Sequence, residues 1–202
     1  VALSLFTSRE ALFGLPPLKK IFFLPRVCAS PVGVDPLLMQ VLPTSLEFLR
    51  LSPLESLTPF NTWVRDLAHL TKLRTLWLSP NSVAPDEKLC NHEMLVGLPT
   101  TLTKLYILTG PNWANNTDLL DHLPPGLINL RVSAMYYDVE PAPFKNHHLT
   151  KLPPSLTHLS VTPTSQISED FFQTAPPHLC SFHLESTTPG FREAKRLFYQ
   201  KP

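Results

Sequence analysis

Apolar residues recur along the chain in a short pattern, Leu-x-x-Φ-x-Φ, in which Φ is a large apolar residue and x is mostly polar. In one copy, Leu156, Leu159 and Val161 occupy the three apolar positions. Two apolar residues spaced two apart point to the same face of a β-strand, so each copy predicts a short strand with one buried face. The leading leucine is expected to fill the corner before the strand. Seven copies fit, and they begin at Leu18, Leu46, Leu73, Leu102, Leu127, Leu156 and Leu179.

The spacing of the copies predicts how they pack on one another. Successive copies start 28, 27, 29, 25, 29 and 23 residues apart. One unit of this size cannot bury its apolar face alone, whereas stacked units pair their strands in parallel and bury a continuous column of leucines. The pattern resembles that of leucine-rich repeat proteins, whose period is ~20–29 residues. The resemblance covers nearly the whole chain and implies an α/β fold class: a leucine-rich repeat solenoid with a curved parallel sheet on its concave face and short helices and irregular turns on its convex face.

Prolines are placed regularly ahead of the strands. The chain has 23 prolines and 6 glycines, and Leu-Pro or Ala-Pro precedes every copy except the third, which reads Leu70-Thr71-Lys72. Proline ends the preceding helix and keeps the incoming chain extended, so it helps to set the direction in which each strand begins. This Leu-Pro punctuation resembles the Leu-Pro-rich subtypes of leucine-rich repeat in bacterial ubiquitin-ligase effectors and in repeat proteins of amoebae and large viruses, although their periods are shorter.

The segments between the strands predict short helices over residues 61–70, 85–96, 117–123 and 168–174. Residues 138–150 contain Pro141, Pro143 and the pair His147-His148 without a clear period, and we expect an irregular loop with solvated histidines. One domain is predicted over residues 1–202, with an N-terminal cap at 1–17, seven repeats at 18–186 and a C-terminal capping helix at 187–202. A partner-binding helix is the alternative for this last segment.

Charge and cysteine content exclude several classes of protein. The 17 Lys plus Arg nearly cancel the 16 Asp plus Glu, which gives no reason to expect nucleic acid or an anionic membrane as a partner. No apolar run approaches the ~18 residues that span a bilayer. Three widely separated cysteines argue against a disulfide framework, so we expect a soluble, intracellular, cytoplasmic protein. The glycosylation tripeptide Asn115-Asn116-Thr117 leaves an extracellular location as the alternative.

Residues between the buried positions of a parallel sheet line up in columns on its other face, about 4.8 Å apart. The column between the two Φ positions, here called the central column, is Phe22, Arg50, Trp77, Tyr106, Arg131, Ser160 and His183. The column two residues earlier, the leading column, is Lys20, Phe48, Thr75, Lys104, Asn129, His158 and Ser181.

Five of the seven central residues are aromatic or arginine, the types that dominate hot spots of protein interfaces. The alternative is a ladder without a partner, because strands favour aromatic residues and neighbouring rings and guanidinium groups stack on one another. The predicted partner-binding residues are Phe22, Phe48, Arg50, Trp77, Lys104, Tyr106 and Arg131.

Residues with catalytic or metal-binding chemistry are few. His158, Cys180 and His183 lie near one another in the predicted sheet, but without a ligand-spacing motif, so we interpret the cluster as coincidental. A phosphate-binding glycine loop, a dinucleotide fingerprint and a paired-acid motif are all missing from the sequence. We therefore expect no enzyme activity, no cofactor and no metal.

Together these features predict a non-catalytic protein–protein interaction scaffold that binds a protein or peptide, and not a small molecule, on its concave sheet face. Lysine and arginine on that face favour an acidic partner. Two alternatives remain: a structural subunit of a large multi-protein assembly, and the substrate-recognition part of a ubiquitin ligase or effector, which the resemblance implies.

Overall fold

The fold was analysed in a computed structural model, which describes residues 17–23, 36–51, 66–78, 95–109, 117–134, 146–161, 175–184 and 196–198. Strands β1 to β7 all begin two residues after a leading leucine of the repeat and pair in parallel with their neighbours in chain order. All seven predicted strands are therefore present. They are β1 (Lys20–Phe23), β2 (Phe48–Leu51), β3 (Thr75–Leu78), β4 (Lys104–Thr109), β5 (Asn129–Ala134), β6 (His158–Val161) and β7 (Ser181–Leu184).

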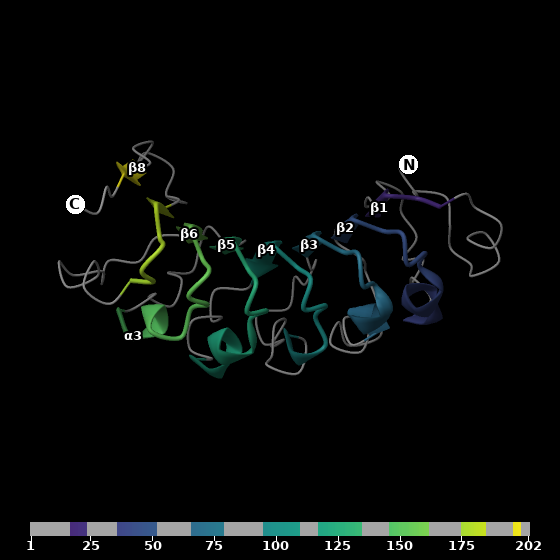
Figure 1. The fold of residues 1–202 in the computed structure, drawn as a ribbon, viewed down its shortest axis with the longest axis horizontal. Coiled ribbons are helices and arrows are strands. Elements are labelled where there is room, and N and C mark those ends of the chain that lie inside the picture. Colours follow the sequence, from purple (N-terminus) through teal and green to yellow (C-terminus); the bar gives the residue numbers. More distant parts are fainter. Residues whose placement is uncertain are drawn as a thin grey trace.

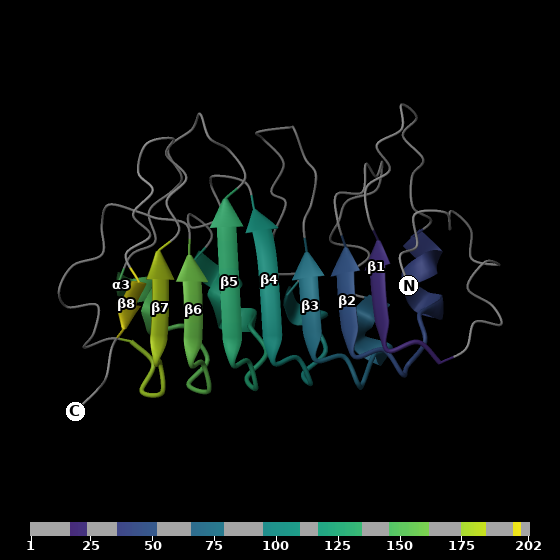
Figure 2. The same ribbon diagram turned by 90° about the horizontal axis from the view of Figure 1, so that it is seen from above.

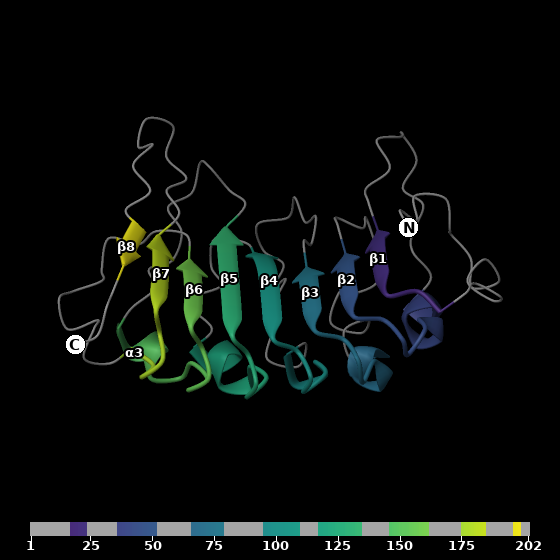
Figure 3. The same ribbon diagram turned by 45° about the horizontal axis from the view of Figure 1, so that its top comes forward.

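The sheet follows one side of an arc, and the short helices follow the other. Figure 1 shows the strands on the inner side of the arc and the helices on the outer side. Seen face-on, β1 to β7 run in the same direction side by side, and an oblique view places the helices behind them (Figures 2 and 3). The helices are η2 (Pro36–Val41), η3 (Asp66–His69), η5 (Thr117–His122) and α3 (Asn146–Leu149). The sheet face away from the helices is thus the concave face.

The core lies between the sheet and the helices and consists mainly of the repeated leucines. Strands β2 and β3 alternate between half-buried and fully buried residues, as a sheet with one covered face requires. Burying a leucine side chain contributes about 1.5–3 kcal/mol, so the column stabilises the whole stack. The leading leucines Leu46, Leu73, Leu102, Leu127 and Leu156 and the strand residues Ile21, Leu49, Leu51, Leu76, Leu78 and Leu105 are all fully buried.

Backbone hydrogen bonds join each copy to the next at the start of the strands. The Glu47 carbonyl accepts from the N–H groups of both Arg74 (2.9 Å) and Thr75 (3.0 Å). The same two-donor arrangement recurs at the other five junctions between adjacent copies. These bonds fix the register, because a shift by one residue would turn the buried side chains to the wrong face. The other acceptors are Lys19, Arg74, Thr103, Ile128 and Thr157.

Hydroxyl side chains add a second link between adjacent copies at every other junction. A Ser or Thr directly before the leading leucine donates a hydrogen bond to the carbonyl of the leading leucine one copy earlier. This link was not predicted, although the recurrence of Ser or Thr at that position signals it. The pairs are Ser45 with Leu18 (3.0 Å), Thr101 with Leu73 (2.8 Å) and Ser155 with Leu127 (2.8 Å).

In the third copy a leucine stands three residues before the leading leucine, and its N–H donates a hydrogen bond. In the fourth copy, Leu98 N–H donates to Leu95 O and the carbonyl of the next residue, Pro99, accepts from Leu102. The third copy is one residue shorter here, and Leu70 makes both bonds: its N–H donates to Leu67 O (2.9 Å) and its carbonyl accepts from Leu73 (3.0 Å). Proline has no N–H and could not replace it.

The predicted helices agree with the structure where it describes them. Helix η5 covers most of residues 117–123, η3 lies inside 61–70, and Leu95 and Val96 are helical at the end of 85–96. The segment 168–174 and the N-terminal cap, apart from Pro17, lie outside the described residues.

Two predictions about the C-terminal half are wrong. Residues 146–149 of the expected irregular loop form helix α3, and His148 in it is buried, with 2% of its surface exposed, whereas His147 is exposed. Residues 196–198 of the expected capping helix form strand β8 (Arg196–Phe198), which pairs antiparallel with β7. Pairing with β7, and not local helix propensity, determines the structure of residues 196–198. A strand, and not a helix, therefore lies beside the last copy at these residues.

Candidate functional site: the concave sheet face

Both predicted columns exist on the concave face. Cross-strand register places Phe22 beside Arg50, Arg50 beside Trp77, Trp77 beside Tyr106 and Tyr106 beside Arg131, and the column continues to Ser160 and His183. The leading column is in register in the same way, from Lys20 to Ser181. The structure therefore brings all seven predicted partner-binding residues together on one face.

The centre of this face carries a stack of three side chains from adjacent strands, here called the central stack: Arg50, Trp77 and Tyr106. The Arg50 guanidinium carbon lies 4.7 Å from the centroid of the Trp77 ring. The Trp77 and Tyr106 ring centroids are 4.8 Å apart, and their planes differ by 20°. Both distances match the ~4.8 Å spacing of strands, so the sheet itself sets the stacking distance. Cation–π and ring-stacking contacts of this kind contribute about 0.5–1.5 kcal/mol each.

Stacking determines which parts of the rings meet the solvent. Arg50 and Tyr106 come from the strands on either side of β3, so they cover the two faces of the Trp77 ring. Trp77 and Tyr106 are nevertheless only half-buried. The concave side of this pair therefore presents mainly ring edges, which carry the positive part of the aromatic quadrupole.

A second aromatic contact lies next to the stack and joins the two columns. The ring centroids of Phe22 and Phe48 are 4.9 Å apart with a tilt of 38°. Phe22 belongs to the central column on β1 and Phe48 to the leading column on β2, so the contact runs diagonally across the sheet. The aromatic surface thus extends over β1 to β4.

The concave face is positively charged although the chain as a whole is nearly neutral. The fourteen positions of the two columns hold four lysines or arginines and no aspartate or glutamate. Lys20, Lys104 and Arg131 are exposed and Arg50 is half-buried. Of the acidic residues that the structure describes, Glu47 lies next to the face, before β2, and it pairs with Lys19 at 3.0 Å. The central stack is therefore flanked by lysine and arginine residues of the same two columns.

The histidines and the cysteine near the C-terminal end of the sheet make contacts with residues close to them in the chain. Register pairs His158 with Ser181 and His183 with Ser160, which puts the two histidines in different columns. His158 Nδ1 lies 2.7 Å from Thr157 Oγ1, and the exposed Cys180 thiol donates to the His178 carbonyl at 3.2 Å. Within the part of the chain that the structure describes, no three His, Cys, Asp or Glu side chains are grouped so that they could hold a metal ion. These contacts are local and polar.

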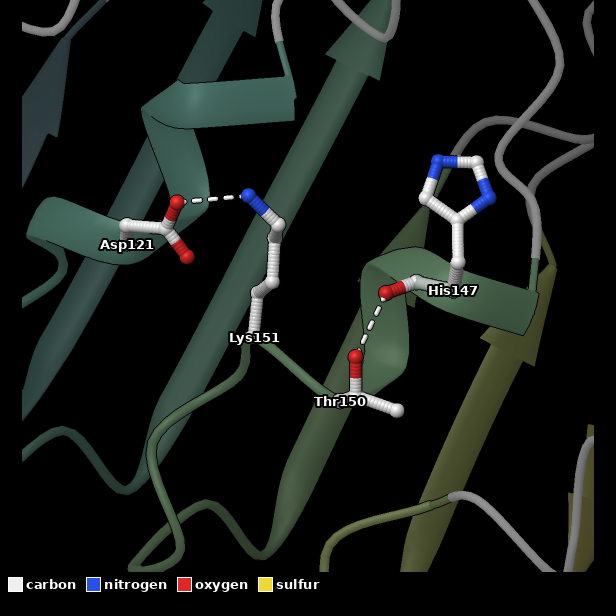
Figure 4. A network of polar contacts seen from close by, with 4 residues as sticks. All are labelled: Asp121, His147, Thr150 and Lys151. Atoms are coloured by element: carbon white, nitrogen blue, oxygen red, sulfur yellow. Dashed lines mark hydrogen bonds and ion pairs between the residues drawn. The ribbon is translucent and has the colours of Figure 1, made fainter.

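On the convex side, polar contacts tie adjacent copies together (Figure 4). Lys151 Nζ lies 2.5 Å from Asp121 Oδ2, which joins the turn after α3 to η5. Thr150 Oγ1 donates to the His147 carbonyl at 2.8 Å and closes α3. The ring of His147 lies edge-on to His148, with centroids 4.1 Å apart. This convex region lies on the side of the sheet away from the central stack.

Comparison with known proteins identifies the fold. No protein-family model matches the sequence, and no curated protein matches it either. Among solved structures, the chain is similar to the leucine-rich repeat-containing protein LegL7 from Legionella pneumophila, with 15% sequence identity and a TM-score of 0.55. The match covers 92% of this chain and 63% of LegL7. The fold is therefore a leucine-rich repeat solenoid. No helix in the described ranges is long and apolar enough to cross a membrane.

Proposed function

We propose that the protein is a non-catalytic scaffold that binds a protein or peptide partner on its concave sheet face. The observation that carries this proposal is the central stack of Arg50, Trp77 and Tyr106, which lies between further cations in the middle of an otherwise continuous sheet. Tryptophan, tyrosine and arginine are the residues whose truncation most often costs 2 kcal/mol or more in protein interfaces.

A ladder that only stabilises the fold would not need these large side chains. Strands β6 and β7 form with Ser160 and His183 in the same column, and both continue the parallel register. Within the seven parallel strands, the aromatic and arginine residues of the two columns are confined to β1 to β5, and the antiparallel β8 adds Arg196 and Phe198 at the far end of the sheet. The continuous run of such residues on β1 to β5 favours a binding surface over a general requirement of strand formation.

The stack also lowers the entropic cost of binding. Long side chains lose rotamer freedom when they are immobilised in an interface, at about 0.5–1.5 kcal/mol for each residue. Arg50, Trp77 and Tyr106 already restrict one another through the contacts of 4.7 and 4.8 Å. Part of the ordering has thus been completed before a partner arrives, which supports recognition at this point of the face.

A displayed library of random peptides, selected on the immobilised protein, tests the proposal. Peptides should be enriched on the parent protein and should fail to bind the double variant Trp77→Ala/Tyr106→Ala. The matched control is Asp121→Asn/Lys151→Gln on the convex side, which should keep binding, and circular dichroism should show that both variants fold. Selected peptides that bind the concave variant as well as the parent would contradict the proposal.

A further inference from the structure

The cations of the concave face form two pairs with the same geometry. Lys20 on β1 and Arg50 on β2 are diagonal neighbours, and Lys104 on β4 and Arg131 on β5 are diagonal neighbours in the same sense. In each pair the lysine belongs to the leading column and the arginine to the central column of the next strand. The two members of a pair are two residues apart along the strand direction and one strand apart across the sheet, so their backbones are separated by about 8 Å. Both side chains are long enough for one carboxylate between them to contact both cations.

The two pairs lie on either side of β3, three strand steps apart. Arg50 and Arg131 lie on β2 and β5, and Lys20 and Lys104 lie on β1 and β4, so each cation has its counterpart three strand steps away. Three steps of about 4.8 Å give a separation on the order of 14 Å. An extended peptide rises about 3.4 Å for each residue, so residues four apart are also on the order of 14 Å from each other. Side chains four apart also point to the same side of an extended chain.

The surface between the two pairs suits a peptide better than a nucleic acid or a sugar. Bases and sugar rings bind proteins by stacking on the faces of aromatic rings. Both faces of Trp77 are already covered by Arg50 and Tyr106, and ring edges remain. Ring edges attract carbonyl and carboxylate oxygens, which an acidic peptide supplies.

We infer that the partner segment is an extended acidic peptide with two carboxylates four residues apart, one at the pair Lys20/Arg50 and the other at the pair Lys104/Arg131. Its intervening residues lie across Trp77 and Tyr106. This inference rests on the proposed function and specifies the chemistry of its ligand. The fourteen column positions contain no acidic residue that would repel such a peptide.

Fluorescence anisotropy with three labelled peptides tests the inference on the complete chain. The first contains Glu-Leu-Ser-Leu-Glu between glycines, the second has the same composition as Leu-Glu-Ser-Glu-Leu, and the third has glutamines in place of the glutamates of the first. The first should bind about fivefold more tightly than the second, the factor for a second ion pair worth about 1 kcal/mol, and should exceed the third by more. Equal affinity of the first two, or no binding of the first up to about 1 mM, would overturn the inference.

Charge variants locate the contacts. Arg50→Gln and Arg131→Gln should each reduce the advantage of the first peptide to about twofold or less, because one carboxylate then has only a lysine. Lys72→Gln removes the same charge from an exposed turn residue and should leave the advantage unchanged. A labelled U12 RNA that binds more tightly than the first peptide would also overturn the inference.

The library selection separates this inference from the proposed function. If selected peptides lose binding with Trp77→Ala/Tyr106→Ala but show no enrichment of acidic residues four apart, the concave face binds peptides and the spacing rule is wrong. If the selected peptides bind Trp77→Ala/Tyr106→Ala as tightly as the parent protein, the proposed function itself fails.

Discussion

The rings of Trp77 and Tyr106 are stacked at 4.8 Å between adjacent strands, with 20° between their planes. Because each ring is part of the other's environment, replacing both should cost less than the sum of the two single replacements. We expect a coupling free energy of about 0.5–1.5 kcal/mol in a cycle of Trp77→Ala, Tyr106→Ala and the double variant. Urea unfolding of the four proteins measures it. Additive losses would show that the rings do not stack in solution.

Gly126 occupies the position at which Ser45, Thr101 and Ser155 link their copies to the copy before. A serine there is expected to donate to the carbonyl of Leu102, as Ser155 donates to Leu127 at 2.8 Å. A Cβ atom at residue 126 would meet the Thr100 carbonyl oxygen at 3.8 Å, an ordinary contact, so the substitution fits. Gly126→Ser should therefore raise the free energy of unfolding by about 0.5–1.5 kcal/mol more than Gly126→Ala does.

Chemical denaturation of the two variants and the parent provides the comparison. Both substitutions replace glycine and so reduce the conformational entropy of the unfolded chain. The difference in the free energy of unfolding between the serine and alanine variants therefore measures the contribution of the hydroxyl group. A serine variant no more stable than the alanine variant would mean that the link does not form in the fifth copy.

The strands and columns could be predicted because the period of two in a strand admits only one register once the leucines are buried. Given that Leu76 and Leu78 face the core, Trp77 has to face the other side, and its neighbours follow from the repeat. The stacking of Trp77 on Arg50 and Tyr106 could be proposed but not decided from the sequence, since it depends on the rotamers that the three side chains select together.

The two wrong predictions concern helix α3 and strand β8, which lie outside the Leu-x-x-Φ-x-Φ copies. Helix α3 has four residues, too few to show a helical period, so its sequence looked like a loop and the burial of His148 could not be recognised. Strand β8 lies in a charged segment with helix-forming residues, and it is a strand because β7 offers an edge with which to pair. Tertiary contacts override local propensity at β8.

The ion pair between Asp121 and Lys151 should contribute little to stability despite its short distance of 2.5 Å. Its side chains are 45% and 28% exposed, so water and salt screen the attraction. We expect Lys151→Gln to lower the free energy of unfolding by no more than about 1 kcal/mol, and by less at high salt. Thermal unfolding at two salt concentrations checks this. A larger loss that salt does not change would indicate that packing of the lysine stem, and not its charge, holds the two copies together.

Leu70 should not tolerate proline, although five of the other six copies carry proline three residues before the leading leucine. Its N–H donates to Leu67 O and its carbonyl accepts from Leu73, whereas Pro153 of the sixth copy only accepts, from Leu156. Leu70→Pro removes a buried hydrogen bond as well as apolar contacts, and Leu70→Ala removes the contacts alone. We expect the proline variant to be less stable than the alanine variant by about 1–3 kcal/mol in urea unfolding. Pro153→Ala, at a position that needs no N–H, is the matched control and should change stability by less than about 1 kcal/mol. Equal stability of the two Leu70 variants would show that the missing residue of the third copy, and not the need for a donor, explains why proline is absent there.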